Sequence, residues 1–180
     1  MATTAAGTPY VESSDLVANY PGVSLALANH IDTIGKVLQV VRATDVTMRS
    51  TTSTSYVDVT GMSITITPQK STSAIMIIVA ANVDNVSSVQ NTNGTVAIAD
   101  SSNNIISGTG ALIGIYNVAV DQGGTPKVAL DAVTVIGWAL PATISAVTYK
   151  ARFKSDSASN TMNFRNNTCT GQMFAIEVAA

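Results

Sequence analysis

Four aspartates are the residues best suited to acid–base chemistry in this chain: Asp84, Asp100, Asp121 and Asp131. Two carboxylates that flank a glycosidic bond can hydrolyse it, one as general acid and the other as base or nucleophile. Each of these aspartates, however, is expected at a turn or at a strand edge, where Asp commonly accepts backbone hydrogen bonds. The sequence therefore predicts no catalytic residue, and a polysaccharide depolymerase is the enzymatic alternative.

His30 and Cys169 are the only histidine and the only cysteine. A Ser-His-Asp triad or a histidine metal site would have to be built on His30. His30 instead borders an apolar helical stripe, as expected of a polar residue on a helix flank. If three such helices met at an axis, its protonation near about pH 6.5 would loosen them. A single cysteine forms no intrachain disulfide. We therefore expect no metal site and no cofactor.

Phosphate recognition is not indicated either. The run Gly108–Gly114 lacks the Lys-Ser/Thr of a P-loop and leads into a predicted strand. The net charge is −2, from 9 Lys and Arg against 11 Asp and Glu. The only cationic cluster is Lys150, Arg152 and Lys154, which alternates with apolar residues as on the solvent side of a half-buried strand. The sequence predicts no nucleic-acid partner, although a small patch at this cluster is an alternative.

Aromatic side chains could bind a sugar by stacking, with Asn and Asp supplying hydrogen bonds. Trp138 is the only tryptophan, and its apolar neighbours favour a core position over a sugar platform. Tyr56 and Tyr116 fit either role.

Few residues carry a charge: 11% of the chain, against about 25% in an ordinary soluble domain. A lone monomer covers itself with charged side chains, so this composition favours either a membrane or an assembly that hides much of each subunit. No signal peptide is recognisable at the N-terminus, and the apolar runs are too short to span a bilayer as a helix. Aromatic residues make up only 5%, too few for the girdles of a membrane barrel. We therefore expect burial in an assembly and no membrane insertion.

Residues 1–35 have a helical pattern. Pro21 suits a first helical position, and Gly35 is a natural terminator. Between them, apolar residues recur at spacings of four, four and three, which predicts one stripe along a helix of about 20 Å. The residues expected to make attachment or oligomer contacts lie on this stripe or just before it: Leu16, Val17, Val23, Leu27, Ile31 and Ile34.

Residues 36–180 have the pattern of an all-β domain. Met62, Ile64 and Ile66 alternate with polar residues, and the segment 74–83 is apolar on both faces, as in a central strand. Further strands are predicted over 94–99, 111–120, 128–140, 147–154, 162–164 and 174–178. Nine or ten short strands separated by turns indicate a β-sandwich or jelly roll after a short helical segment.

Two stretches resemble proteins of tailed-bacteriophage virions. The segment Pro9–Val17, followed by Tyr20-Pro21, Val23-Ser24 and Ala26–Ala28, resembles an N-terminal attachment segment of tail, fibre and head-fibre proteins. The segments Ser50–Ile78, Ala139–Thr143, Val147–Ser155 and Met173–Val178 are similar to a C-terminal head domain of phage fibres. The chain departs from that domain between Asn82 and Gly124, where it lacks an Arg-rich strand.

The resemblance implies a non-enzymatic structural protein on the virion exterior. It would be a short homotrimeric head or tail fibre, attached to other virion proteins by residues 1–35, with a β head at 36–180. A capsid decoration protein that stabilises the shell and an adhesin that binds a host-surface glycan are the alternatives.

Overall fold

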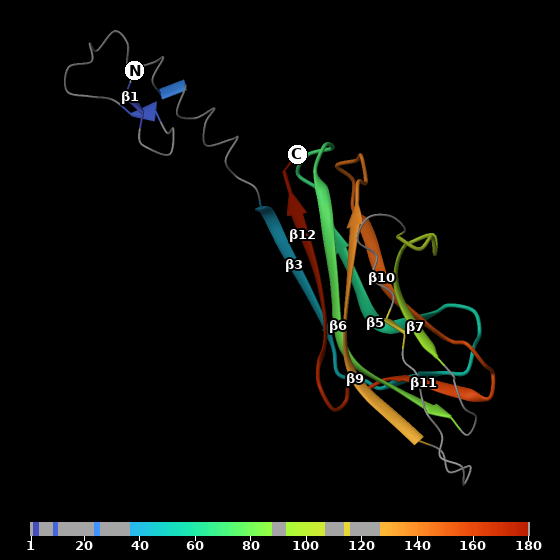
Figure 1. The fold of residues 1–180 in the computed structure, drawn as a ribbon. Helices are drawn as coiled ribbons and strands as arrows, with labels where there is room; N and C mark the ends of the chain where they lie inside the picture. The colour runs from blue at the N-terminus through green and yellow to red at the C-terminus, as the bar shows by residue number, and fades with distance from the viewer. Residues whose placement is uncertain are drawn as a thin grey trace.

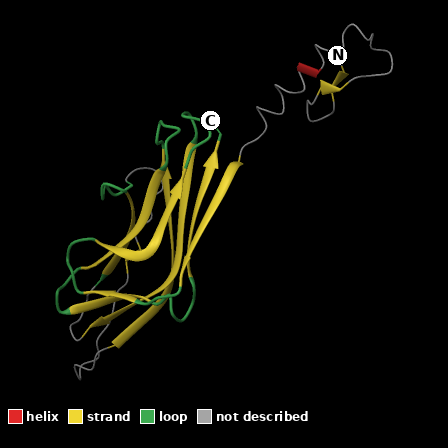
Figure 2. Ribbon diagram, turned by 180° about the vertical axis from the view of Figure 1, so that it is seen from behind, coloured by secondary structure: helices red, strands yellow, loops and turns green. Residues whose placement is uncertain are grey.

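The computed structural model describes residues 2–3, 9–10, 24–25, 37–87, 93–106, 114–115 and 127–179, and side-chain positions for most of these (Figure 1). The described part is mainly β, and all of its strand pairs are antiparallel (Figure 2). The prediction of a mainly β chain is therefore confirmed.

Little of residues 1–35 is described. Strands β1 (Ala2–Thr3) and β2 (Pro9–Tyr10) pair with each other, and Ser24 and Leu25 have helical backbone. The predicted helix over 21–34 otherwise lies outside the described residues, as does its apolar stripe. The helix and the domain boundary at residue 35 stay predictions.

The smaller sheet has four strands in the order β5-β10-β7-β8. They are β5 (Val57–Ile66), β10 (Val147–Ser155), β7 (Gly94–Asp100) and β8 (Gly114–Ile115). Gly61 interrupts β5 with a positive φ of 94°, and the register with β10 shifts at this point. Because of this bulge, Val59 and Met62 both face the core although they are three residues apart.

The larger sheet is built around β6 (Ala74–Ser87), which pairs along its whole length with β9 (Lys127–Ala139) (Figure 1). The other edge of β6 has two partners in succession. β12 (Gly171–Val178) pairs with its first half and β11 (Asn160–Phe164) with its second half. β3 (Val37–Asp45) and β4 (Arg49–Thr51) then pair with β12 and β11 in the same way.

The strands β11 and β12 are thus two pieces of one interrupted strand, and so are β3 and β4. The two interruptions lie side by side, because Asp45 at the end of β3 pairs with Gly171 at the start of β12. Asn166, in the loop between β11 and β12, is buried and donates from Nδ2 to Asp45 Oδ2 at 2.9 Å. The Arg165 backbone amide donates to the Asn82 carbonyl oxygen, so the hydrogen bonding between β11 and β6 continues into this loop.

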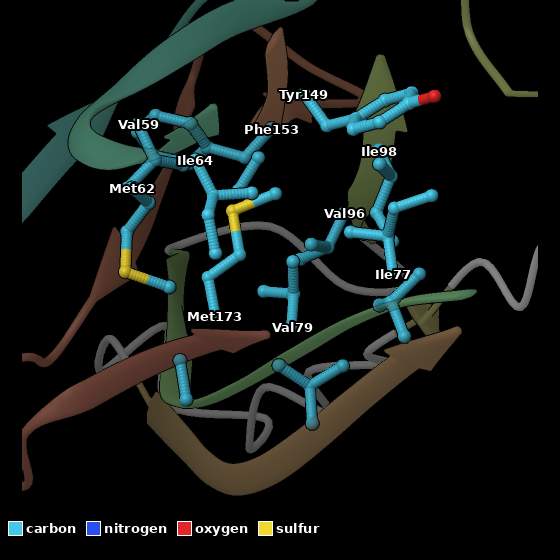
Figure 3. Packing of buried hydrophobic residues seen from close by; sticks show 14 of the residues in the cluster. Val59, Met62, Ile64, Ile77, Val79, Val96, Ile98, Tyr149, Phe153 and Met173 are labelled. Carbon is cyan, nitrogen blue, oxygen red and sulfur yellow. The ribbon is translucent and has the colours of Figure 1, made fainter. Parts of the chain in front are cut away.

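One hydrophobic core lies between the two sheets, and the labelled side chains of Figure 3 converge on it from both sides. The smaller sheet contributes Val59, Ile64, Val96 and Phe153 among others, and the larger sheet contributes Ile77, Val79, Phe164 and Met173 among others. The Phe153 and Phe164 rings meet edge to face, with centroids 5.2 Å apart. The arrangement is that of a sandwich, with one inner and one outer face on each sheet.

Candidate interaction surface

The outer face of the smaller sheet is polar. On β5, Ser63 and Thr65 alternate with buried Met62, Ile64 and Ile66. The Thr65 hydroxyl lies 2.7 Å from that of Thr148 on β10. This alternation is typical of a sheet with one face in the core and the other in water.

The predicted cationic cluster lies on this polar face, and each of its charges has a neighbour. Lys150 and Arg152 donate to the two carboxylate oxygens of Asp58, at 2.7 and 2.8 Å. The Lys154 ammonium lies 5.1 Å from the ring centre of Tyr56, within cation–π distance. Burial opposes ionisation of Asp58, but the two cations outweigh it and lower its pKa. Asp58 therefore offsets part of the positive charge of the cluster.

The outer face of the larger sheet is apolar where four strands lie side by side. One cross-strand row runs from Trp138 on β9 through Met76 on β6 and Ile176 on β12 to Val40 on β3. The next row runs from Ile136 through Ile78 and Phe174 to Arg42. We call the seven apolar members of these rows the apolar face: Val40, Met76, Ile78, Ile136, Trp138, Phe174 and Ile176.

The apolar face is accessible in the described part of the chain. Val40 is 57% exposed and Trp138 is 41% exposed, while the other five members are partly buried. Toward one end of the sheet lie Val37, 57% exposed, and Leu140, 71% exposed. Contiguous exposed apolar patches are candidate sites of contact with a protein, a membrane or a ligand.

Arg42 is the single charged residue in these two rows. It donates from Nη2 to Gln172 Oε1 at 3.0 Å, and its guanidinium lies 5.8 Å from the Phe174 ring centre. Gln172 pairs with Ala80 and Thr44, so a more polar row follows the apolar rows. Arg42 is exposed, and its two neighbours Gln172 and Phe174 are both uncharged.

Trp138 corrects a sequence prediction. A core position was expected for it, but its side chain faces outward because Gly137 and Ala139 take the inward positions of β9. A Cβ on Gly137 would lie 3.3 Å from Ile98 Cδ1 of the smaller sheet, which fixes that inward direction. Because both faces of this segment are apolar, the sequence alone does not distinguish its inward from its outward residues.

A groove of about 500 Å³ lies beside the apolar face, where the end of β9 meets the turn 101–106 and the start of β10. Trp138, Leu140, Asn104 and Thr148 are among its lining residues. Asp100 also lines it and accepts hydrogen bonds from the Asn104 side chain and from the backbone N–H groups of Asn104 and Ser102. These bonds, that from the Asn104 side chain first, lower the pKa of Asp100. Glycan recognition stays a prediction.

The other candidate carboxylates have different surroundings. Asp84 lies inside β6, not at a turn or strand edge as predicted, and it is 1% exposed. Asn163 donates to its Oδ1, and Arg165 Nε lies 3.1 Å from its Oδ2. These polar partners, some 80 residues away in sequence, offset the cost of burying the carboxylate. The Asp131 backbone lies in β9 opposite Val83, and Asp121 lies outside the described residues.

The buried carboxylate of Glu177 anchors the edge of the larger sheet. It projects inward from β12 and accepts hydrogen bonds from Gln39 Nε2 at 2.6 Å and from the Gln69 and Lys70 amides at 2.8 and 3.2 Å. Burial raises its pKa, but these hydrogen bonds prevail and lower it. The carboxylate thereby ties β3 and the turn before β6 to the strand that carries Ile176.

The predicted attachment residues Leu16, Val17, Val23, Leu27, Ile31 and Ile34 all lie outside the described residues, as do His30 and Tyr116. Cys169 is exposed in the loop between β11 and β12, as its turn-rich surroundings predicted. Among the described residues, no three His, Cys, Asp or Glu side chains are grouped to hold a metal ion. No helix in that same part has the length and hydropathy to cross a bilayer.

Comparisons with known proteins leave the family open. No family model matches the chain, and no curated protein matches it. A solved structure of infectious bursal disease virus, Gx strain, is 14% identical, with a TM-score of 0.25. A structure of the Gt strain is also 14% identical, with a TM-score of 0.15. In both, the alignment covers 79% of this chain and 38% of the other chain. At these TM-scores the likeness does not define a shared fold.

Proposed function

We propose that this protein is a structural subunit of a virion, a short homotrimeric fibre of a tailed bacteriophage on the particle exterior. The observation that carries the proposal is the contrast between the two outer faces of the sandwich. Ser, Thr and paired charges cover the smaller sheet, whereas the larger sheet presents the apolar face. A free monomer would leave that face in water, and a subunit of an assembly would bury it.

The composition supports the same role. Charged residues make up 11% of the chain, and several of those described are paired within the fold. Charges at a subunit interface cost desolvation energy, so a chain that is buried among neighbours is better served by Ser, Thr and Asn. Residues 9–28 resemble a virion attachment segment, and this resemblance makes the virus particle the proposed partner. In this proposal residues 1–35 attach the subunit and the β domain projects outward.

Replacement of Leu27 and Ile31 by Asp tests the attachment role. The double variant puts two charges on the predicted stripe, so we expect the β domain to fold but to be lost from purified particles. The matched control replaces Leu25 and Asn29 by Asp, on the opposite side of the same predicted helix. Mass spectrometry of purified particles measures the copy number of each variant. Normal incorporation of the Leu27 and Ile31 variant contradicts the proposal.

A further inference from the structure

We infer that the apolar face is a self-association surface, which packs against the apolar faces of other copies of this chain around a symmetry axis. The inference rests on the proposed function and adds the surface and the partner. It follows from the charge, the shape and the number of such faces on the subunit.

The charge of the face permits an identical partner. Its two rows contain one cation, Arg42, which lies on β3 at the edge of the described sheet and is exposed. Because a long Arg side chain reaches water from such an edge, the guanidinium stays at the rim when two copies meet and the seven apolar residues form the contact.

The shape of the face also suits a copy of itself. Two sheets pack on each other through apolar faces at a separation of about 10 Å, with their side chains interdigitated, and two copies of the apolar face would meet in the same way. Trp138 supplies the large aromatic side chain that dominates many interfaces, and Met76, Ile176 and Val40 extend its row to the far strand. Gln172 and Thr44 border these rows as a polar rim.

The area sets a requirement on the contact. Four strands about 4.8 Å apart and two rows of side chains about 7 Å apart cover about 270 Å². A stable interface buries about 800 Å² on each partner, so the seven residues are the centre of the contact and not all of it. Exposed Val37 and Leu140, which extend the face toward one end of the sheet, are the first residues expected to join it.

The number of faces limits the kind of assembly. The described outer face of the smaller sheet is polar, so the described part of each subunit offers one apolar sheet face. One self-complementary face closes a dimer, and three copies with their faces at an axis close a trimer. Within the described residues, neither arrangement leaves a second apolar sheet face from which a filament could grow.

Two exposed members of the face provide the test. We expect Val40→Asp with Trp138→Asp to convert the wild-type multimer into a folded monomer of 18.5 kDa, measured by sedimentation velocity over a range of concentrations. The control is Ser63→Asp, an exposed strand residue on the polar face, which should keep the wild-type mass. If the double variant does not fold by circular dichroism, Val40→Asp alone carries the test, because this edge-strand side chain is 57% exposed. We expect it to weaken association at least tenfold.

Cross-linking locates the contact independently of stability. In a Cys169→Ser background, Val40→Cys should be joined to another copy by a short bismaleimide, and Ser63→Cys should not. Unchanged mass in the Asp variants, a monomeric wild type, or a face occupied only by another virion protein or by the chain's own residues 1–35 would each overturn the inference. If the variants dissociate but the protein is absent from particles, the surface stands and the virion role fails. If the subunit is present in particles but the face variants keep the wild-type mass, the role stands and the surface is wrong.

Discussion

Glu177 shows how a single residue couples the stability of the domain to pH. Its carboxylate is fully buried, and hydrogen bonds from the Gln39 side chain and two backbone amides hold its charged form. Its pKa in the folded protein is therefore below the ordinary 4.5. Folding favours the charged form, so this stabilisation is complete above about pH 4.5 and is lost as the pH falls through the lowered folded-state value.

Glu177→Gln tests this coupling. Near pH 7 the free energy of unfolding of the variant should be about 1–3 kcal/mol lower than that of the wild type, because one acceptor for buried N–H donors is lost. The gap between the two proteins should narrow below about pH 4.5, where wild-type Glu177 begins to take up a proton. Urea unfolding between pH 3 and 7 measures both curves. A constant gap over that range would show that the charge of Glu177 contributes nothing to stability.

Among the elements, the feature that organises the larger sheet is the pair of interrupted strands on one side of β6. The breaks between β3 and β4 and between β11 and β12 lie together, where Asn166 donates to Asp45. The break lets one long strand, β6, serve two sets of partners in the same sheet. The apolar rows lie on the β12 side of this break and the Asp84 cluster lies on the β11 side.

Asn166→Ala should destabilise the domain by about 1–3 kcal/mol, because it removes a buried side chain and leaves a partly buried carboxylate oxygen of Asp45 with one partner fewer. The neighbouring residue, exposed Asn167, provides the control, and Asn167→Ala should lie within about 0.5 kcal/mol of the wild type. Thermal or urea unfolding compares the two. Equal effects would mean that the loop between β11 and β12 does not hold the two breaks together.

The sequence predicts those elements whose pattern is local. Alternation in 147–154 correctly placed Tyr149, Ala151 and Phe153 inside and the cations outside. The segment 74–83, apolar on both faces, was correctly expected to form a central strand. The same reasoning did not place β3 and β4, the buried position of Asp84 or the outward side of Trp138. Each of these depends on a partner far away in sequence, such as Arg165 for Asp84 and β6 for β9.

The apolar face could have been anticipated in part. Met76 and Ile78 in β6, and Phe174 and Ile176 in β12, stand at alternate positions whose neighbours are also apolar or buried. A two-sided apolar strand indicates cover on both sides. Which strands lie beside it, and therefore which residues complete the rows, is set by the antiparallel register of four segments and needed the structure.

Over the whole molecule, the two outer sheet faces differ in polarity. In the proposed function, the polar outer face of the smaller sheet meets water and the apolar face of the larger sheet meets other subunits. Since the proposed contact is apolar and its two rows contain no carboxylate that could pair with Arg42 of another subunit, salt should not dissociate the assembly. An assembly held by ion pairs between subunits would loosen as the ionic strength rises.

The mass of the wild-type protein in solution tests this account most directly. Sedimentation equilibrium from low to high protein concentration, in about 0.1 M and in about 1 M salt, should give one multiple of 18.5 kDa that is the same in both. A single 18.5 kDa species at the highest concentration would contradict it, because the apolar face would then remain in water.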